Sequence, residues 1–72
     1  MAAAYDEDEL VTLLVGVVAD DVAALTQSKA YEYVTGDARV KLIDGDLQKG
    51  LVAAGKLVVV NEDGVAKYAL PA

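Results

Sequence analysis

The last third of the chain, residues 44–70, constrains the fold most strongly because it reads as one helix that leads directly into a β-hairpin. Within residues 46–54 three apolar residues lie on one helical face at i, i+4 and i+7: Leu47, Leu51 and Ala54. Gly55 follows at a position where helices commonly end. We expect Asp44 or Asp46 to cap the start of this helix.

Two short extended runs follow, residues 56–60 and 65–70, and the first of them is rich in valine. Residues 61–64 (Asn-Glu-Asp-Gly) join these runs and contain the polar residues and glycine that turns require. Because Gly64 readily adopts positive φ, we expect a four-residue connection with a type I turn that closes in a G1-type bulge. The pattern therefore predicts a C-terminal hairpin.

The N-terminal third begins with residues 1–5, which we expect to be frayed, and continues with four acids at residues 6–9. Carboxylates are stabilised at the positive end of a helix dipole, so the acidic block predicts a helix start. A cation site or a contact with a basic partner are the alternatives for this block. The apolar residues that follow have helical spacing, which predicts a helix with a wide buried stripe. The residues of the stripe are Leu10, Leu13, Leu14, Val17 and Val18, and Gly16 lies inside the same helix.

A continuation of that helix would place Asp21 about 20° from Leu10, inside the buried arc. We therefore expect the helix to end at Asp20 and Asp21. Asp21 then caps a short second helix at residues 22–27, with Val22 and Leu25 pointing inward. The alternative is one long helix that places Asp21 at a subunit boundary.

The sequence indicates the secondary structure of the middle of the chain less clearly. Residues 29–35 alternate in a way that suits a short strand with Tyr31 and Tyr33 on the same face, either packed on the helices or exposed as an aromatic pair. Residues 38–43 fit both a strand and a helix. In the helical alternative Asp37 caps a single turn, which leads into the next helix and makes a helix-turn-helix.

Composition excludes several classes of function. The 72 residues predict one domain, and 12 acids against 6 bases give a net charge of −6 that repels phosphate polymers and anionic membranes. The chain has no cysteine and no histidine, so the commonest metal ligand and the commonest general base are both missing. The apolar run at residues 10–19 is short and follows acids, so we expect no signal peptide, no membrane span and a cytoplasmic location.

No motif in the sequence points to catalysis. Asp44-Gly45-Asp46 resembles the opening of a calcium loop, but Lys49 and Gly55 stand where that loop needs a glycine and a bidentate glutamate. Helix capping explains these acids better. The threonines and serine have no histidine or cysteine partner, so we expect no enzyme, no cofactor and no metal site.

The expected order of helix, short strand, short helix, turn, helix and hairpin resembles the winged-helix superfamily. The likeness is strongest at residues 47–55 (LQKGLVAAG), at residues 56–60 (KLVVV) and at the pair Tyr68 and Leu70 near the end of the second wing strand. The resemblance implies a small α+β domain over residues 1–72 with a C-terminal wing. It is a likeness of fold, on which many functions occur.

Winged-helix domains commonly bind DNA by laying the last helix in the major groove while the wing touches the backbone. The resemblance would place Gln48 and Lys49 on the reading face and residues 61–64 at the wing tip. The full set of candidate DNA contacts is Arg39, Lys41, Gln48, Lys49 and Lys56. The acids at the same places disfavour phosphate contacts: Asp44, Asp46, Glu62 and Asp63.

Because many winged helices bind proteins, we expect a non-catalytic protein-binding module, an accessory, phage-type or regulatory protein. Its candidate partner contacts are Tyr31, Tyr33, Glu62 and Asp63. A homodimer through the first helix or the tyrosine face is a further expectation. A DNA-binding transcriptional regulator is the alternative, and a DNA-mimicking inhibitor with a continuous acidic stripe is a weaker one.

Overall fold

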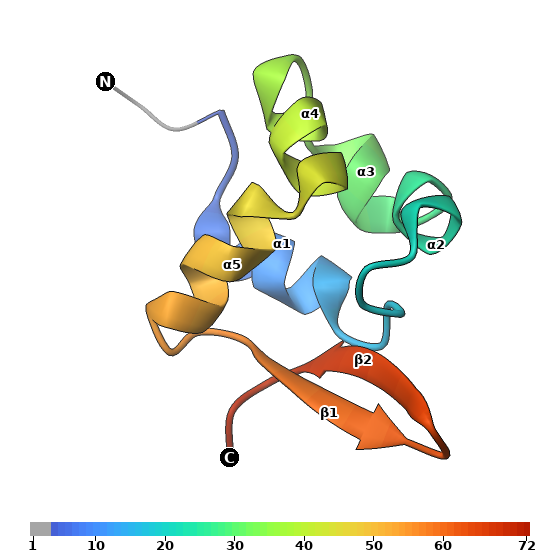
Figure 1. Ribbon diagram of the computed structural model, residues 1–72. Coiled ribbons are helices and arrows are strands. Elements are labelled where there is room, and N and C mark those ends of the chain that lie inside the picture. Colours follow the sequence, from blue (N-terminus) through green and yellow to red (C-terminus); the bar gives the residue numbers. More distant parts are fainter. Residues whose placement is uncertain (1–3) are drawn as a thin grey trace.

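The computed structural model describes residues 4–72, which form five helices followed by a two-stranded antiparallel hairpin at the C-terminus. The elements are α1 (Glu7–Leu14), α2 (Val22–Thr26), α3 (Lys29–Tyr33), α4 (Asp37–Asp44), α5 (Asp46–Ala53), β1 (Val58–Glu62) and β2 (Val65–Ala69). Figure 1 shows the helices gathered on one side of the molecule, with the hairpin beneath them. The prediction of a small α+β domain is confirmed at this level.

The core lies between the helices and the inner face of the hairpin, and leucine is its main constituent. Every helix and β2 contribute to it. The buried apolar residues are Leu10, Val11, Leu14, Leu25, Ala30, Val34, Ala38, Leu42, Leu51, Leu57 and Tyr68. Each fully buried leucine contributes roughly 1.5–3 kcal/mol relative to an exposed one, so the core depends on a small number of side chains.

Helix α1 begins where the acidic block predicts. The Oδ1 atom of Asp6 accepts hydrogen bonds from the backbone N–H groups of Asp8, at 2.9 Å, and Glu9, at 3.3 Å. The expectation of a frayed end is wrong for Tyr5, which packs against the core, and residues 1–3 lie outside the described part of the chain.

The expected continuation of α1 to Val18 is wrong, because the helix ends at Leu14. Gly16 is not helical but has a φ of +88°, which reverses the chain direction at low steric cost. The valines on either side of Gly16 favour extended backbone, so the helical spacing of this run competes with its β propensity and loses.

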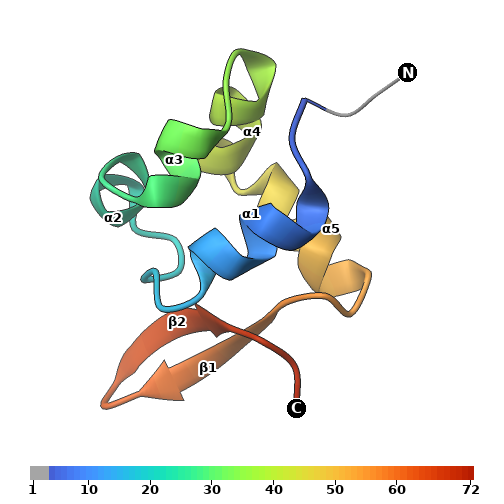
Figure 2. The ribbon, with the colours of Figure 1, turned by 180° about the vertical axis from the view of Figure 1, so that it is seen from behind.

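Beyond Gly16 the chain runs alongside β2, and we call residues 16–19 the linking segment. Figures 1 and 2 show it lying against β2 from both sides of the molecule. Its backbone hydrogen bonds run from Gly16 N to Tyr68 O (2.8 Å), from Tyr68 N to Val17 O (3.0 Å) and from Ala19 N to Ala66 O (2.8 Å). An isolated bridge also pairs Val18 with Lys67. The linking segment therefore joins α1 to the hairpin.

The predicted cap by Asp21 is confirmed, since its carboxylate accepts a hydrogen bond from Ala24 N at 3.0 Å at the start of α2, although the first helix ends at Leu14 and not at Asp20. Leu25 points into the core as expected, but Val22 is 54% exposed, so its predicted burial is wrong. The helix is too short for both side chains to reach the core.

The strand expected at residues 29–35 is wrong, because Lys29–Tyr33 is helix α3. The Oγ atom of Ser28 caps this helix by accepting a hydrogen bond from Tyr31 N at 3.3 Å. A cap of this kind turns an alternating five-residue run into one helical turn. Residues two apart on a helix point about 200° apart, so Tyr31 and Tyr33 do not share a face.

The segment left open at residues 38–43 is helical and belongs to α4. Gly45, with a φ of +89°, both ends α4 and begins α5, and neither helix start has a side-chain cap. The predicted caps by Asp37, Asp44 and Asp46 are therefore wrong, because the N-cap residues are glycines, Gly36 before α4 and Gly45 before α5, which have no side chain to accept a hydrogen bond. The predicted helix at residues 46–54 and its glycine stop at Gly55, φ +74°, are confirmed.

Both hairpin strands are confirmed, but the turn between them is shorter than predicted. Glu62 pairs with Val65, so Asp63 and Gly64 alone form the loop. Their φ values of +54° and +82° are those of a type I′ turn, whose twist matches that of the strands better than the predicted type I turn with a bulge. The Oδ1 atom of Asn61 accepts a hydrogen bond from Gly64 N at 3.0 Å and supports this turn.

The Asp21 cap gives a first test of the fold. We expect Asp21→Ala to lower the free energy of unfolding by about 1 kcal/mol, because α2 loses the partner of its Ala24 N–H group. Urea denaturation followed by circular dichroism measures this change. Asp44→Ala is the matched control, since Asp44 makes no cap bond, and its effect should stay within about 0.5 kcal/mol. Equal losses in both variants would contradict the described cap.

Candidate functional site

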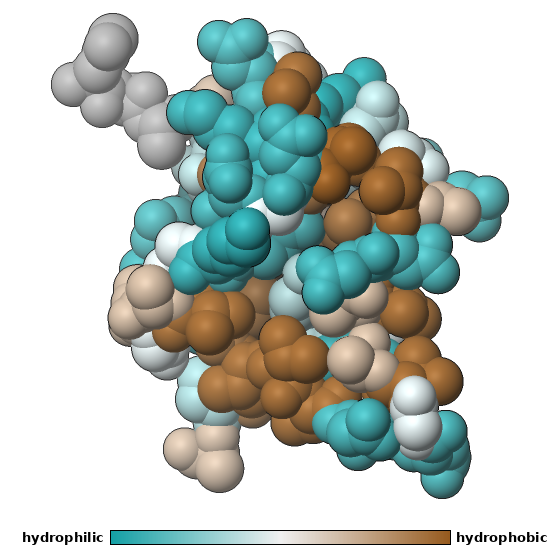
Figure 3. Space-filling view, viewed as in Figure 1, coloured by the Kyte–Doolittle hydropathy of each residue, from teal (hydrophilic) through white to brown (hydrophobic). Residues whose placement is uncertain are grey.

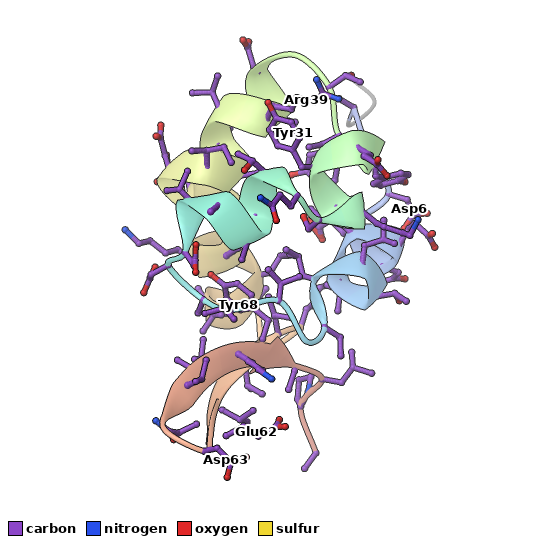
Figure 4. All side chains as sticks on the ribbon, turned by 90° about the vertical axis from the view of Figure 1, so that its right-hand side faces the viewer. Asp6, Tyr31, Arg39, Glu62, Asp63 and Tyr68 are labelled. Atoms are coloured by element: carbon purple, nitrogen blue, oxygen red, sulfur yellow. The ribbon has the colours of Figure 1, made fainter. Side chains whose placement is uncertain are left out.

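A pocket of about 390 Å³ lies between α5 and the hairpin. Val52 and Ala53 border it from α5, while Val59, Ala66 and Tyr68 border it from the inner face of the hairpin. These three strand residues share that face because Val59 pairs with Tyr68 and Asn61 pairs with Ala66 across the ladder. Figure 4 shows Tyr68 between the hairpin and the helices.

The rim of this pocket is apolar and partly exposed. Val52 is 41% exposed and Val59 is 49% exposed. Val60 and Val65, on the opposite face of the hairpin, are not part of the rim. Figure 3 shows apolar surface extending over α5 and onto the hairpin. A surface of this kind on a small domain marks a place where another molecule can be bound. We call the pocket and its rim the α5–hairpin site.

The floor of the site contains one polar side chain, Gln48, which is only 2% exposed. Its Nε2 atom donates a hydrogen bond of 2.8 Å to the carbonyl oxygen of Leu42 and so ties α5 to α4. Its Oε1 atom has no hydrogen-bond partner among the described residues. A buried acceptor without a partner is costly, and a ligand that brings a donor into the pocket would relieve that cost.

Asp20 and Lys49 provide the charges at the edge of the site. Asp20 has a φ of +60°, a conformation that aspartate tolerates better than most residues. Burial raises the pKa of the Tyr68 hydroxyl, and the negative charge of Asp20 raises it further. The nearby Asp20 backbone and Gln48 side chain oppose that rise. Tyr68 is therefore neutral at physiological pH and offers a hydroxyl to the pocket.

The residues suggested as DNA contacts are not brought together. Gln48 is buried and cannot read a base edge. Arg39 is occupied within its own chain, because its Nε atom donates hydrogen bonds to the carbonyl oxygens of Tyr31, at 3.1 Å, and Val34, at 3.0 Å. Its guanidinium also lies 4.5 Å from the centre of the Tyr31 ring. Figure 4 labels both residues, which lie side by side.

Lys56 forms an ion pair with Glu7 of α1, at 2.7 Å between Nζ and Oε1. The hydrogen bond to Glu7 and the charge of that carboxylate raise the pKa of Lys56. Lys49 borders the α5–hairpin site, whereas Lys41 borders a hollow with Tyr5 on another part of the surface. These side chains therefore do not form one basic face.

The suggested partner contacts also lie apart. Tyr31 packs under Arg39, and the hydroxyl oxygen of Tyr33 accepts a hydrogen bond of 3.0 Å from Asp6 N. Both tyrosines thus hold parts of their own chain together. Glu62 and Asp63 lie at the hairpin tip, where Figure 4 shows them far from Asp6 and Tyr31.

The sequence interpretation missed Val52, Val59 and Ala66 as members of a site. A usable signal was present in the run Val58-Val59-Val60, which places valine on both faces of a strand. A two-stranded hairpin packs only one face on a core, so at least part of this run has to remain exposed.

Comparisons of the chain with known family models, with curated proteins and with solved structures give no match. Among residues 4–72, no helix has the length and apolar character needed to cross a membrane. Within the same residues, the acidic side chains do not gather in groups of three that could hold a metal ion.

The environment of Tyr68 predicts how stability changes in alkali. Because its folded pKa is raised above the unfolded value of about 10, the folded state holds its proton more tightly, and stability should fall as pH rises past about 10. Urea denaturation at pH 8 and at pH 10.5 measures this fall. It should be smaller in Tyr68→Phe and unchanged in Tyr31→Phe, which retains Tyr68. An equal fall in all three proteins would contradict the burial of the Tyr68 hydroxyl.

Proposed function

We propose that the protein is a non-catalytic protein-binding module of winged-helix type, which holds an apolar side chain of its partner in the α5–hairpin site. The observation that carries the proposal is the exposed apolar pocket between α5 and the hairpin. Pockets that combine apolar walls with a few polar groups are the usual sites of recognition. Gln48 and Tyr68 are the polar groups of this one.

The order of elements supports the assignment to a winged-helix type. An extended linking segment follows the first helix, two helices meet at Gly45, and a hairpin follows the second of them. The order differs from the one expected from the sequence in two ways: the extended segment lies at residues 16–19 rather than 29–35, and residues 29–33 form the additional helix α3. The short helix α2 was expected.

The character of the site favours a protein partner over DNA. In the winged-helix arrangement α5 and the wing would face DNA, but here valines and alanines occupy the space between them. DNA binding depends chiefly on neutralising phosphates, and the candidate cations do not gather on one face of this domain. Desolvating apolar surface instead favours a partner with apolar side chains of its own.

A DNA-mimicking role receives less support. Such a mimic needs carboxylates in one continuous stripe, whereas the acids of this chain are divided among the start of α1, the residues just before α2, α3, the start and end of α4, the start of α5 and the hairpin tip. Figure 4 shows Asp6 and the pair Glu62 and Asp63 at separate ends of the molecule.

The proposal is tested by cross-linking capture of partners from cells that express the protein, followed by a direct binding measurement with the purified partner. Val52→Asp places a charge in the apolar rim and should weaken that binding at least about tenfold, since burying an unpaired carboxylate is costly. Val22→Asp is the matched control, because Val22 is also exposed, at 54% against 41% for Val52, but lies on α2, away from the site. Its binding should equal that of the natural sequence.

Equal binding by all three proteins would remove the α5–hairpin site from the proposal. Fluorescence anisotropy with random duplex DNA tests whether the protein binds DNA instead of a protein partner. Tight binding at low salt that weakens steeply as salt is added would replace the protein-binding proposal with DNA binding.

A further inference from the structure

Strand β1 has one paired edge and one free edge. The linking segment and β1 lie on opposite sides of β2, so β2 is paired on both edges and β1 on only one. Figures 1 and 2 both show the free edge of β1 at the rim of the molecule, with no helix drawn across it. An open edge presents a row of backbone groups to which another strand can pair.

The ladder identifies which backbone groups face outward. Tyr68 and Ala66 direct backbone groups to the linking segment and therefore away from β1. Their cross-strand partners are Val59 and Asn61, so these two pairs are of the non-hydrogen-bonded type. The N–H and C=O groups of Val59 and Asn61 consequently point to the free edge. Among residues 4–72, no backbone hydrogen bond from outside the hairpin reaches them.

The residues of this edge lack the usual protection against pairing. Natural edge strands commonly carry lysine, proline or a bulge, whereas the first three residues of β1 are valines and the ladder is regular from Val58 to Glu62. Val59 and Val60 remain 49% and 40% exposed on opposite faces of the strand. Both faces near this edge would therefore lose exposed apolar surface when another strand is added.

The charges at the two ends of the edge suggest which strand that is. Lys56 lies two residues before β1 and Glu62 ends it, so an antiparallel copy of the same segment presents these charges in reverse order. Antiparallel pairing centred on Val59 puts Val59 opposite Val59 of the other copy. It also puts each Lys56 opposite a Glu62, and each Val58 opposite a Val60. In this register the backbone groups that point to the free edge of one copy face those that point to the free edge of the other copy.

We infer that the free edge of β1 is a self-association surface, at which a second copy of this chain pairs antiparallel about Val59 to form a two-fold symmetric dimer with a continuous sheet. The same patch on both copies is self-complementary in hydrogen bonding, apolar surface and charge, as a two-fold contact requires. An unrelated strand would have to supply all three features independently.

The pair between Lys56 and Glu7 does not prevent this association. Both side chains are about half exposed, at 44% and 49%, so Lys56 can exchange its partner or bridge both carboxylates. The surface also differs from the dimer contacts expected from the sequence. The apolar side chains of α1 are largely in the core of their own chain, and Tyr31 and Tyr33 serve internal contacts.

A charge-swap experiment tests the surface and the register together, with sedimentation equilibrium as the measurement. The natural sequence should dimerise in a concentration-dependent way. Lys56→Glu alone and Glu62→Lys alone should each raise the dimer dissociation constant about tenfold, because two attractive pairs become two repulsive ones. An equimolar mixture of the two variants should regain dimers, since each mixed dimer again pairs lysine with glutamate at both positions.

Two control variants separate the loss of the Lys56–Glu62 pairs between copies from the loss of the Lys56–Glu7 pair and from the change in net charge. Glu7→Gln removes the intramolecular partner of Lys56 and should leave the dimer intact. Lys41→Glu changes the net charge by the same amount as Lys56→Glu, away from the edge, and should also leave it intact. A mixture that remains monomeric, or single variants that dimerise like the natural sequence, would overturn the inference.

Dilution of the natural sequence, followed by NMR, tests the dimer without any variant. On dilution, the NMR amide signals of Val59 and Asn61 should shift as their partners are lost, while those of Gly16 and Ala19 should stay constant. A protein that remains monomeric at millimolar concentration, or shifts confined to residues outside β1, would overturn the inference.

Discussion

The pairing of the linking segment with β2 is the interaction on which the rest of the structure depends. A two-stranded hairpin is marginal by itself, so the C-terminal strands need a third element and a helical layer to persist. Gly16 permits the chain to leave α1 and run along β2, where the backbone groups of Tyr68 and Ala66 find their partners. This pairing joins residues that lie about fifty positions apart and closes the core.

The same pairing determines what the hairpin presents to its surroundings. With β2 paired on both edges, β1 is left as the free strand. Tyr68 is directed under the helices, and Val59 and Ala66 line the space against α5. The α5–hairpin site and the free edge of β1 thus lie next to each other, and both result from the pairing of the linking segment with β2. Both are apolar, which agrees with a role in binding proteins better than with a role in binding polyanions.

The sequence predicted the elements whose signals are local and unopposed. The Asp21 cap, the helix that stops before Gly55 and the two strands of the hairpin all follow from spacing and turn chemistry. Errors arose where two local signals compete. Residues 29–35 alternate like a strand, yet the Ser28 cap makes them a helical turn.

The site was harder to predict than the fold because it depends on pairings between distant residues. Helical spacing continues through Val17 and Val18, and only the distant partner β2 reveals why the chain leaves the helix at Gly16. Gln48 illustrates the same limit. A polar residue one position after Leu47 reads as exposed, but the close turn at Gly45 brings α4 near enough for Gln48 to bond Leu42 and become buried.

Native-state hydrogen exchange by NMR tests the central pairing most directly. If the linking segment pairs with β2 as described, the amides of Gly16, Ala19 and Tyr68 should exchange as slowly as those in the middle of α5 and lose protection together with them in low concentrations of urea. Fast exchange of Gly16 and Ala19, at rates typical of the exposed amide of Asp63, would contradict the account and leave the hairpin without its attachment to α1.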